Sequence, residues 1–229
     1  MNGWSKLTSC ATLGVVVAAA WLSQGCATRP VSFARGPREY VATDYRTVLK
    51  RWTRDEVPIA AGAVNDLLLA TATYESWDFR WAYTIRYAED FRLSVAERQQ
   101  MLEKELAETT VEHHFYVAVH APQTKWADLT AEPPAWVVRL VDDTGNETEP
   151  EAIERIRKPS AVELTYFPYT SPWRTAHRIR FPAMVDGRRT ISPEAHWFGL
   201  RFSGPTGYQQ VVWELEGDTD RGDTARQGG

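Results

Sequence analysis

The periodicity of the chain changes at His114-Phe115-Tyr116-Val117-Ala118-Val119-His120. Before this stretch the apolar residues recur every three or four positions, as they do in helices, and after it they alternate with polar residues. Successive side chains of a strand point to opposite faces, so Phe115, Val117 and Val119 share the face that we expect to be buried. The stretch therefore predicts the first strand of a β region that continues almost to the C-terminus.

Further strands are expected where the same alternation returns, between turn-forming stretches such as 143–146 and 203–207. An earlier strand within 64–74 is preferred to a helix, because residues 67, 69, 71 and 73 alternate with their neighbours. Seven or eight short antiparallel strands separated by turns predict a β-sandwich of immunoglobulin-like character. From the change in periodicity onward, the expected strands are 114–120, 135–142, 151–157, 161–167, 176–181, 197–203 and 208–215.

Two helices are predicted just before this β region, at about 76–91 and 95–112. Ser76 is the expected N-cap of the first, and Ser94 followed by Glu97 has the spacing of a capping box. Aromatic residues at helical spacing supply the buried side of the first helix. The pair is therefore expected as an insertion into the sandwich, and the predicted fold class is α+β with mainly β content.

A third helix is expected over about 38–55, near the N-terminus. One stripe of this helix is apolar and holds Tyr45, Val48, Leu49 and Trp52. The opposite face is basic and holds Arg46, Lys50, Arg51 and Arg54. A basic face is most often a solvated helix surface, but beside a membrane it also suits contact with anionic lipid, and both interpretations stay open.

The first 25 residues have the features of a secretory signal. Lys6 supplies positive charge and is followed by an apolar run at 13–22. That run is too short for a permanent membrane-spanning helix, which needs about 20 apolar residues. Small residues and a cysteine, Gly25-Cys26, follow it directly.

This N-terminal segment resembles a bacterial lipoprotein signal peptide, whose lipobox is usually Leu, then Ala or Ser, then Gly or Ala, then Cys. The match is good at Gly25 and Cys26, whereas Ser23 stands where Leu is commonest and Leu22 lies one residue early. The resemblance implies that residues 1–25 are removed as a signal peptide and that Cys26 is the site of lipid attachment. The protein would then be bound to the membrane through its N-terminal lipid.

The residue after the cysteine bears on both processing and destination. Ordinary cleavage after Ala27 is the alternative to lipidation, because Gly25 and Ala27 satisfy a small-x-small rule. By the same resemblance, Ala27 in place of Asp favours sorting to the outer membrane over the inner membrane. Beyond the signal region the body resembles, in architecture alone, bacterial envelope lipoproteins of unknown role.

Composition limits the remaining possibilities. The processed chain would have 229 − 25 = 204 residues, enough for one main domain. Without Lys6 it holds 25 basic and 30 acidic residues, a balance that does not favour binding of nucleic acid. We expect a lipidated tether at 26–36, an N-terminal helix and linker at 37–62, the sandwich at 63–216 with the helical insertion at about 76–112, and a disordered tail at 217–229.

Histidines are the side chains from which a metal site or acid–base catalysis could be built. Along one strand, His114 and His120 lie about 20 Å apart, too far to share one metal ion that holds each ligand at about 2 Å. A pair from neighbouring strands, such as His120 with His177, stays possible. Because the chain has no Gly-x-Ser-x-Gly, no His-Glu-x-x-His and no Gly-rich phosphate loop, it predicts no catalytic residue, no metal site and no cofactor.

A binding surface is better supported, because Arg with Trp and Tyr is the composition that interface hot spots favour. Alternation places some of these residues opposite the expected core of their strands, and others lie in turns. The turn tryptophans either contact a partner or fold back over the ends of the sandwich, and the second interpretation is slightly preferred. The candidate partner-binding residues are Trp126, Trp173, Arg178, Arg180, Trp197 and Arg201.

The sequence therefore predicts a membrane-anchored envelope lipoprotein that is not an enzyme. Its expected role is that of a binding or assembly module for a protein or glycan partner. The alternative is a hydrolase or metal-dependent enzyme that uses His113, His114, His120, His177 or His196.

Overall fold

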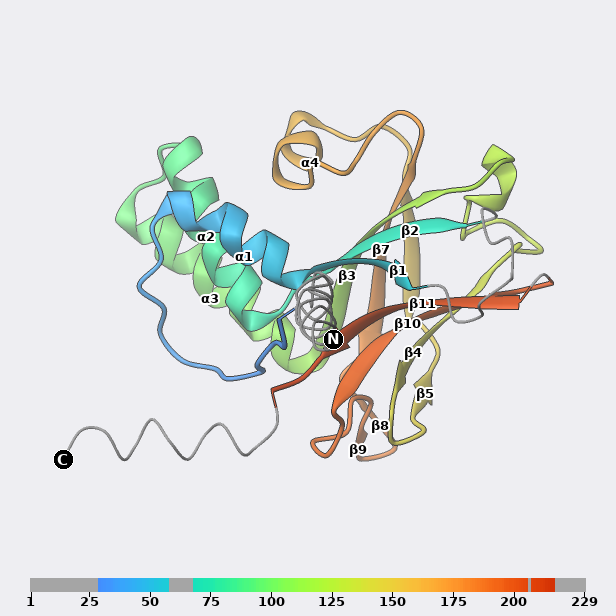
Figure 1. Cartoon of the computed structure of the whole chain (residues 1–229). Coiled ribbons are helices and arrows are strands. Elements are labelled where there is room, and N and C mark those ends of the chain that lie inside the picture. The colour runs from blue at the N-terminus through green and yellow to red at the C-terminus, as the bar shows by residue number, and fades with distance from the viewer. Residues whose placement is uncertain (1–28, 58–67, 206, 217–229) are drawn as a thin grey trace, which may run out of the picture.

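The computed structural model describes residues 29–57, 68–205 and 207–216. These residues form one large antiparallel β-sheet and four α-helices, so the predicted α+β class is confirmed (Figure 1). The predicted signal segment, Cys26 and the predicted C-terminal tail from 217 lie outside the described residues, and so does the part of the early predicted strand at 64–67.

Nine strands form the sheet, in the order β5-β4-β10-β11-β1-β2-β3-β7-β6, and a short hairpin of β8 (Met184–Val185) and β9 (Arg188–Arg189) stands apart from it. Six of the predicted strands are confirmed, with ends that differ by at most two residues. The strands of the sheet are β1 (Thr53–Val57), β2 (Leu69–Tyr74), β3 (Glu112–His120), β4 (Val137–Asp142), β5 (Glu147–Thr148), β6 (Ala152–Ile156), β7 (Thr175–Pro182), β10 (Trp197–Gly204) and β11 (Gly207–Glu214).

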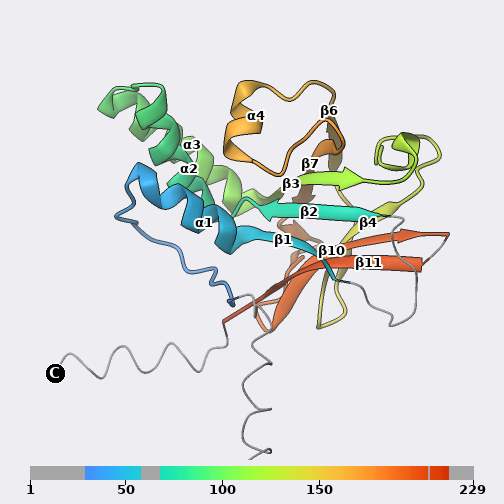
Figure 2. The same cartoon turned by 45° about the horizontal axis from the view of Figure 1, so that its top comes forward.

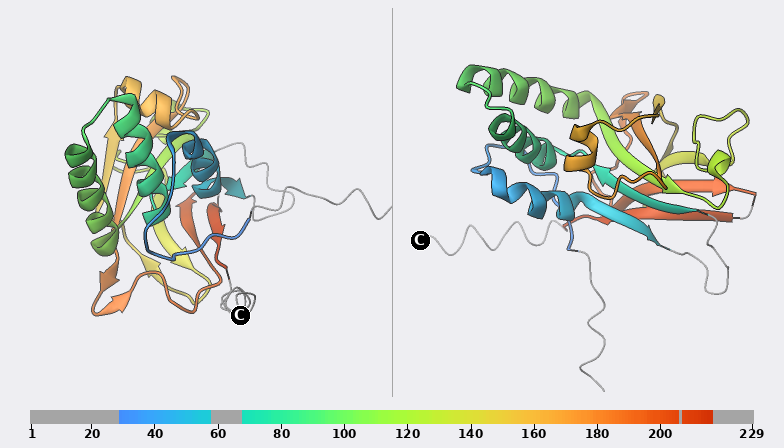
Figure 3. Two further views of the ribbon diagram at one scale, coloured as in Figure 1. Left: turned by 90° about the vertical axis from the view of Figure 1, so that its left-hand side faces the viewer. Right: turned by 90° about the horizontal axis from the view of Figure 1, so that it is seen from above.

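The sheet curves so strongly that its two halves pack against each other. Strands β2 and β10 are three positions apart in the sheet, a separation of about 14 Å if the sheet were flat. The ring centroids of Tyr74 on β2 and Phe198 on β10 are nevertheless only 5.2 Å apart. Phe115 on β3 and Trp213 on β11, also three strands apart, are separated by 5.6 Å. The aromatic core therefore lies inside the curve of the sheet. The curvature of the strands is visible in Figure 3 (left).

Strand β1 connects the two halves of the sheet. It pairs with β2 through Thr53–Asp55 and with β11 through Glu56 and Val57. The sequence predicts a helix to about residue 55 and a linker beyond it, but the helix ends at Trp52 and the backbone of Thr53 is extended. The pairing of β1 on both edges explains this difference, because ladder hydrogen bonds to two strands are contacts that helical periodicity does not reveal.

Three of the helices lie together at one end of the strands (Figure 3, right). They are α1 (Tyr45–Trp52), α2 (Trp77–Asp90) and α3 (Val95–Val111). The predicted caps are confirmed, because Ser76 Oγ accepts a hydrogen bond from the Phe79 backbone (3.0 Å) and Ser94 forms a capping box with Glu97. The helices α2 and α3 connect β2 with β3, which are neighbours in the sheet. The helical pair therefore lies in the connection between two adjacent strands of the sheet.

The predicted strand at 161–167 is wrong, because Ala161–Tyr166 forms the short helix α4. Ser160 caps this helix: its Oγ accepts a hydrogen bond from the Val162 backbone (3.2 Å), and Glu163 accepts one from the Ser160 backbone (2.8 Å). This is the same Ser-x-x-Glu capping box that begins α3. The local capping signal therefore outweighs the apparent two-residue alternation, and the helix covers a face of the sheet, where Tyr116 stacks on Phe167 at 3.9 Å.

The segment that precedes α1 is held against the sheet. Val31, within the predicted tether, is buried and forms a bridge to the end of β11. Its backbone donates to Glu214 (2.8 Å) and accepts from Glu216 (2.9 Å). The chain therefore has a fixed point only a few residues after the cysteine.

Candidate functional site

The partner-binding candidates do not gather on one surface. Arg178 and Arg180 lie on β7, whereas Trp197 and Arg201 lie on β10, which is separated from β7 by four strands of the sheet. Their orientation agrees with the predicted alternation, because Ile179 and the apolar residues of β10 are buried between them.

The arginines among these candidates are engaged within the protein. Arg178 pairs with Glu163 (3.1 Å), Arg180 pairs with Glu112 (3.3 Å) and Arg201 pairs with Glu147 (3.1 Å). Partners that neutralise their charge make these side chains weaker ligands for a further anion. Their role in binding a partner stays a prediction.

The two turn tryptophans differ in burial. Trp126, in a short 3₁₀ turn (Thr124–Trp126), packs partly buried against the core. Trp173, in the segment between α4 and β7, is 82% exposed. The expectation that both cap the sheet therefore describes Trp126 and not Trp173.

The histidines have separate partners and do not converge. Nδ1 of His113 shares a hydrogen bond with the hydroxyl of Tyr74 (2.9 Å), and Nε2 of His114 shares one with the carboxylate of Glu112 (2.7 Å). The other three contact different groups: His120 the carbonyl of Trp173, His177 the backbone N–H of Leu129, and His196 the carboxylate of Asp143. Within the described ranges, no three His, Cys, Asp or Glu side chains are grouped so that they could hold a metal ion.

Burial keeps two of these histidines neutral. It lowers the pKa of His113 to about 4, with a further contribution from the charge of His114. Burial also lowers the pKa of His177 to about 4, although Asp128 acts in the opposite direction. Both rings are therefore uncharged at neutral pH, as expected of buried hydrogen-bonded histidines.

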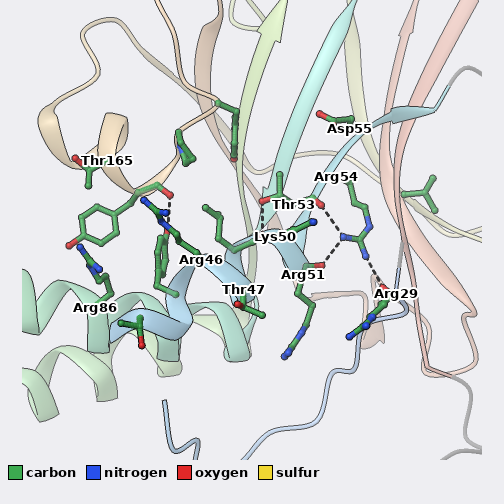
Figure 4. Close-up of a pocket in the computed structure, with 17 residues that line it drawn as sticks. Arg29, Arg46, Thr47, Lys50, Arg51, Thr53, Arg54, Asp55, Arg86 and Thr165 are labelled. Atoms are coloured by element: carbon green, nitrogen blue, oxygen red, sulfur yellow. Dashed lines mark hydrogen bonds between the residues drawn. The ribbon is translucent and has the colours of Figure 1, made fainter. Parts of the chain in front are cut away.

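A large basic cleft lies between α1, β1 and the chain that follows α4 (Figure 4). Its volume is about 1490 Å³. Among the described residues, six cationic side chains and one carboxylate, Asp55, line it. The cationic residues are Arg29, Arg46, Lys50, Arg51, Arg54 and Arg86.

The helix α1 builds one wall of the cleft. Its apolar stripe, predicted from the sequence, is buried as expected. Arg46 and Lys50 are four residues apart, so they lie on the same face of α1 and both reach the cleft. The opposite wall is attached to α1 by Tyr45, whose hydroxyl donates to the carbonyl of Tyr166 (2.6 Å). Figure 4 shows Arg46 and Arg86 toward α4, and Lys50, Arg54 and Arg29 toward β1.

Two of the cleft cations are neutralised by carboxylates. Arg51 pairs with Asp78 (3.0 Å) and Arg86 pairs with Asp90 (2.7 Å). Asp55 is itself engaged by the hydroxyl of Thr71 (2.6 Å).

Three further cations keep their charge available. Within the described ranges, Arg46, Lys50 and Arg54 have no carboxylate at ion-pair distance. The guanidinium of Arg54 is buried and donates to three backbone carbonyls, those of Arg51 (2.7 Å), Thr53 (2.9 Å) and Arg29 (3.0 Å). Burial lowers the pKa of Arg54, which means that its charge is poorly solvated. The charge of Glu214 acts in the opposite direction, so the positive charge of Arg54 is only partly balanced and still favours an anion in the cleft.

The sequence revealed one part of this site and missed the other. The basic face of α1 was recognised from its spacing. Arg29, Arg86 and the wall at Thr165, Tyr166 and Tyr169 were missed, because they come from distant parts of the chain and carry no motif. The Ser160-x-x-Glu163 capping box could have predicted the helix α4, whose last residues, Thr165 and Tyr166, form part of this wall.

Comparison of the chain with protein-family models, with curated proteins and with solved structures found no match. Among the helices of the described ranges, none combines the length and the apolar character that spanning a bilayer requires.

Proposed function

We propose that the protein is a lipid-anchored lipoprotein of the bacterial envelope whose body binds an anionic partner in the basic cleft. The observation that carries this proposal is the convergence of Arg46, Lys50 and the buried Arg54 on one cleft, where none of the three forms an ion pair with a carboxylate of the described ranges. Fixed charges in a partly desolvated concave site raise the local concentration of oppositely charged ligands. A protein, a glycan or a lipid that bears acidic groups fits this description.

The anchor part of the proposal rests on the lipobox-like segment at Cys26. Val31 is fixed to the body and lies 31 − 26 = 5 residues after that cysteine. Five extended residues span at most about 18 Å, so a lipidated Cys26 would hold the body close to the bilayer. Sorting to the outer membrane remains the favoured destination because Ala27 follows the cysteine.

The proposed role is binding and not catalysis. The alternative of a hydrolase or metal-dependent enzyme needs several histidines at one site, and His113, His114, His120, His177 and His196 bond to different groups. The arginines and the lysine of the cleft are suited to hold an anion.

The proposal includes an immunoglobulin-like sandwich only in the sense that two layers of antiparallel sheet pack face to face. Two packed halves of antiparallel sheet around an aromatic core support it. The continuous pairing through β1 distinguishes this chain from two separate sheets.

A crosslinking capture from intact envelopes tests the proposal. The variant Arg46→Gln/Lys50→Gln removes two cleft charges at exposed positions, and Arg98→Gln/Lys104→Gln removes two charges from the exposed surface of α3 as a matched control. We expect the cleft variant to lose the partner captured by the wild type and the control variant to keep it. Equal capture by both variants would contradict the assignment to the cleft, and a mature N-terminus without acyl chains on Cys26 would contradict the anchor.

A further inference from the structure

One end of the cleft lies beside Arg29, close in sequence to the proposed lipid attachment site at Cys26. Arg29, one of its lining residues, is 29 − 26 = 3 residues after Cys26. Three extended residues span at most about 11 Å. The carbonyl of Arg29 accepts a hydrogen bond from the Arg54 guanidinium (3.0 Å), so this part of the chain is attached to the wall of the cleft. The Arg29–Arg54 end of the cleft is therefore held near an acylated cysteine.

We infer that the ligand of the cleft is the phosphate-bearing head group of lipids in the membrane that carries the anchor. The inference rests on the proposed function, because it takes both the lipid anchor and the anionic cleft ligand as given. The ligand chemistry is then a phosphate, and its source is the membrane.

The donors that surround the cleft suit a phosphate. Arginine offers a planar pair of N–H groups, and lysine offers a compact charge, which together match the several oxygens of a phosphate. The exposed hydroxyls of Thr47 and Thr165 add neutral donors along the same walls.

The remaining lining matches the rest of a lipid head group. Tyr45, Leu49, Pro168 and Tyr169 give the cleft apolar and aromatic surface beside its cations. A volume of about 1490 Å³ is far larger than an inorganic phosphate needs and leaves room for the glycerol region of a lipid. Near an anionic bilayer, each Lys or Arg contributes about 1 kcal/mol of attraction, so the uncompensated cations favour the membrane as the source of the phosphate.

Footprinting of lysines tests this inference on the acylated full chain. The protein is reconstituted in vesicles of neutral phosphatidylcholine, with or without anionic phosphatidylglycerol, and exposed to a lysine-acetylating reagent. The mature chain has one lysine in the cleft, Lys50, and three exposed lysines elsewhere, Lys104, Lys125 and Lys158, which serve as internal controls. Mass spectrometry follows the acetylation rate of each.

We expect phosphatidylglycerol to slow the acetylation of Lys50 about fivefold relative to neutral vesicles, which corresponds to a contact of ~1 kcal/mol. The three control lysines should change by less than about twofold, because the anionic surface acts on them only through screened charge. The variant Arg46→Gln should reduce the protection of Lys50, and Arg98→Gln on α3 should leave it intact.

Each other outcome has a definite meaning. Equal acetylation of Lys50 in both kinds of vesicle overturns the inference while the proposed anchor stands. Protection by inorganic phosphate in neutral vesicles, without protection by phosphatidylglycerol, assigns the cleft to a soluble phosphate compound and overturns the lipid source. A protein that fails to float with neutral vesicles contradicts the anchor, and with it this inference.

Discussion

Replacing Asp78 by Asn should destabilise the body, because this carboxylate binds together three segments of the chain. It accepts hydrogen bonds from Arg38 (3.0 Å), Tyr40 (2.6 Å), Arg51 (3.0 Å) and Trp52 (2.9 Å). Asp78 belongs to α2, and its partners come from α1 and from the chain that leads into it. The variant therefore tests whether this cluster holds the basic wall of the cleft in place.

The size of the effect follows from the number of donors that lose an acceptor. An amide has one oxygen and one NH₂ group, so in either orientation two of the four donors face a donor. A lost hydrogen bond to a charged group costs about 1.5–3 kcal/mol. Because Arg51 is partly exposed and regains water, whereas Trp52 is buried, we expect a loss of about 3 kcal/mol in the free energy of unfolding. For a domain of this size that corresponds to a decrease in Tm of about 6–12 °C.

The effect should also depend on pH in a defined direction. Burial by itself raises the pKa of Asp78, but the hydrogen bonds from Trp52, Tyr40 and Arg38 and the charge of Arg51 outweigh it and hold the pKa below the usual value. A depressed carboxyl pKa stabilises the folded state above the pKa of the unfolded chain, about 3.9. The difference between wild type and variant should stay constant from neutral pH to about pH 5 and shrink as the pH falls below about 4.

Urea unfolding followed by tryptophan fluorescence measures this difference at each pH. The matched control is Asp90→Asn on the same helix, where one oxygen of the partly exposed carboxylate accepts from both Arg86 (2.7 Å) and Tyr166 (2.7 Å). Because the amide oxygen of Asn can keep both contacts, this variant should cost less than about 1 kcal/mol. A loss for Asp78→Asn no larger than that of the control, or a loss that is as large at pH 3 as at pH 7, would refute the reasoning.

Three further predictions concern the stability of the body. Ser160→Ala removes the capping hydroxyl of α4 and should cost about 1 kcal/mol in urea unfolding. Trp173→Ala should leave Tm within about 2 °C of the wild type because Trp173 is 82% exposed, whereas Trp126→Ala should lower it clearly because Trp126 packs on the core. Burial lowers the pKa of His177 to about 4, so this histidine takes up a proton more readily in the unfolded chain than in the folded one. The folded state should therefore lose up to about 1.4 kcal/mol of stability per pH unit as the pH falls from about 6.5 toward 4. His177→Asn should remove that dependence in acid titrations of stability.

Much of the fold could be predicted because it is encoded locally. The caps at Ser76 and Ser94 begin their helices where expected, since a side-chain oxygen satisfies backbone N–H groups only a few residues away. The buried stripe of α1 and the alternation along β7 and β10 also follow from the spacing of apolar residues. Where two local signals competed, at 161–167, the capping box prevailed over the alternation.

The strand β1 could not be predicted in this way. Its sequence, Thr53-Arg54-Asp55-Glu56-Val57, continues the helical pattern of α1, and α1 leads directly into it (Figure 2). Its extended conformation depends on β2 and β11, whose positions are set by the rest of the chain.

The sequence by itself determined the positions of the helices, most of the strands and the basic face of α1, because each depends on residues within a few positions of one another. Only the tertiary structure decided that this face lines a cleft. The opposite wall is attached through Tyr45 and Tyr166, which are 121 residues apart, and Arg29 reaches the site through the fixed point at Val31. Long-range contacts of this kind arise from the packing of the whole chain, and no local spacing records them.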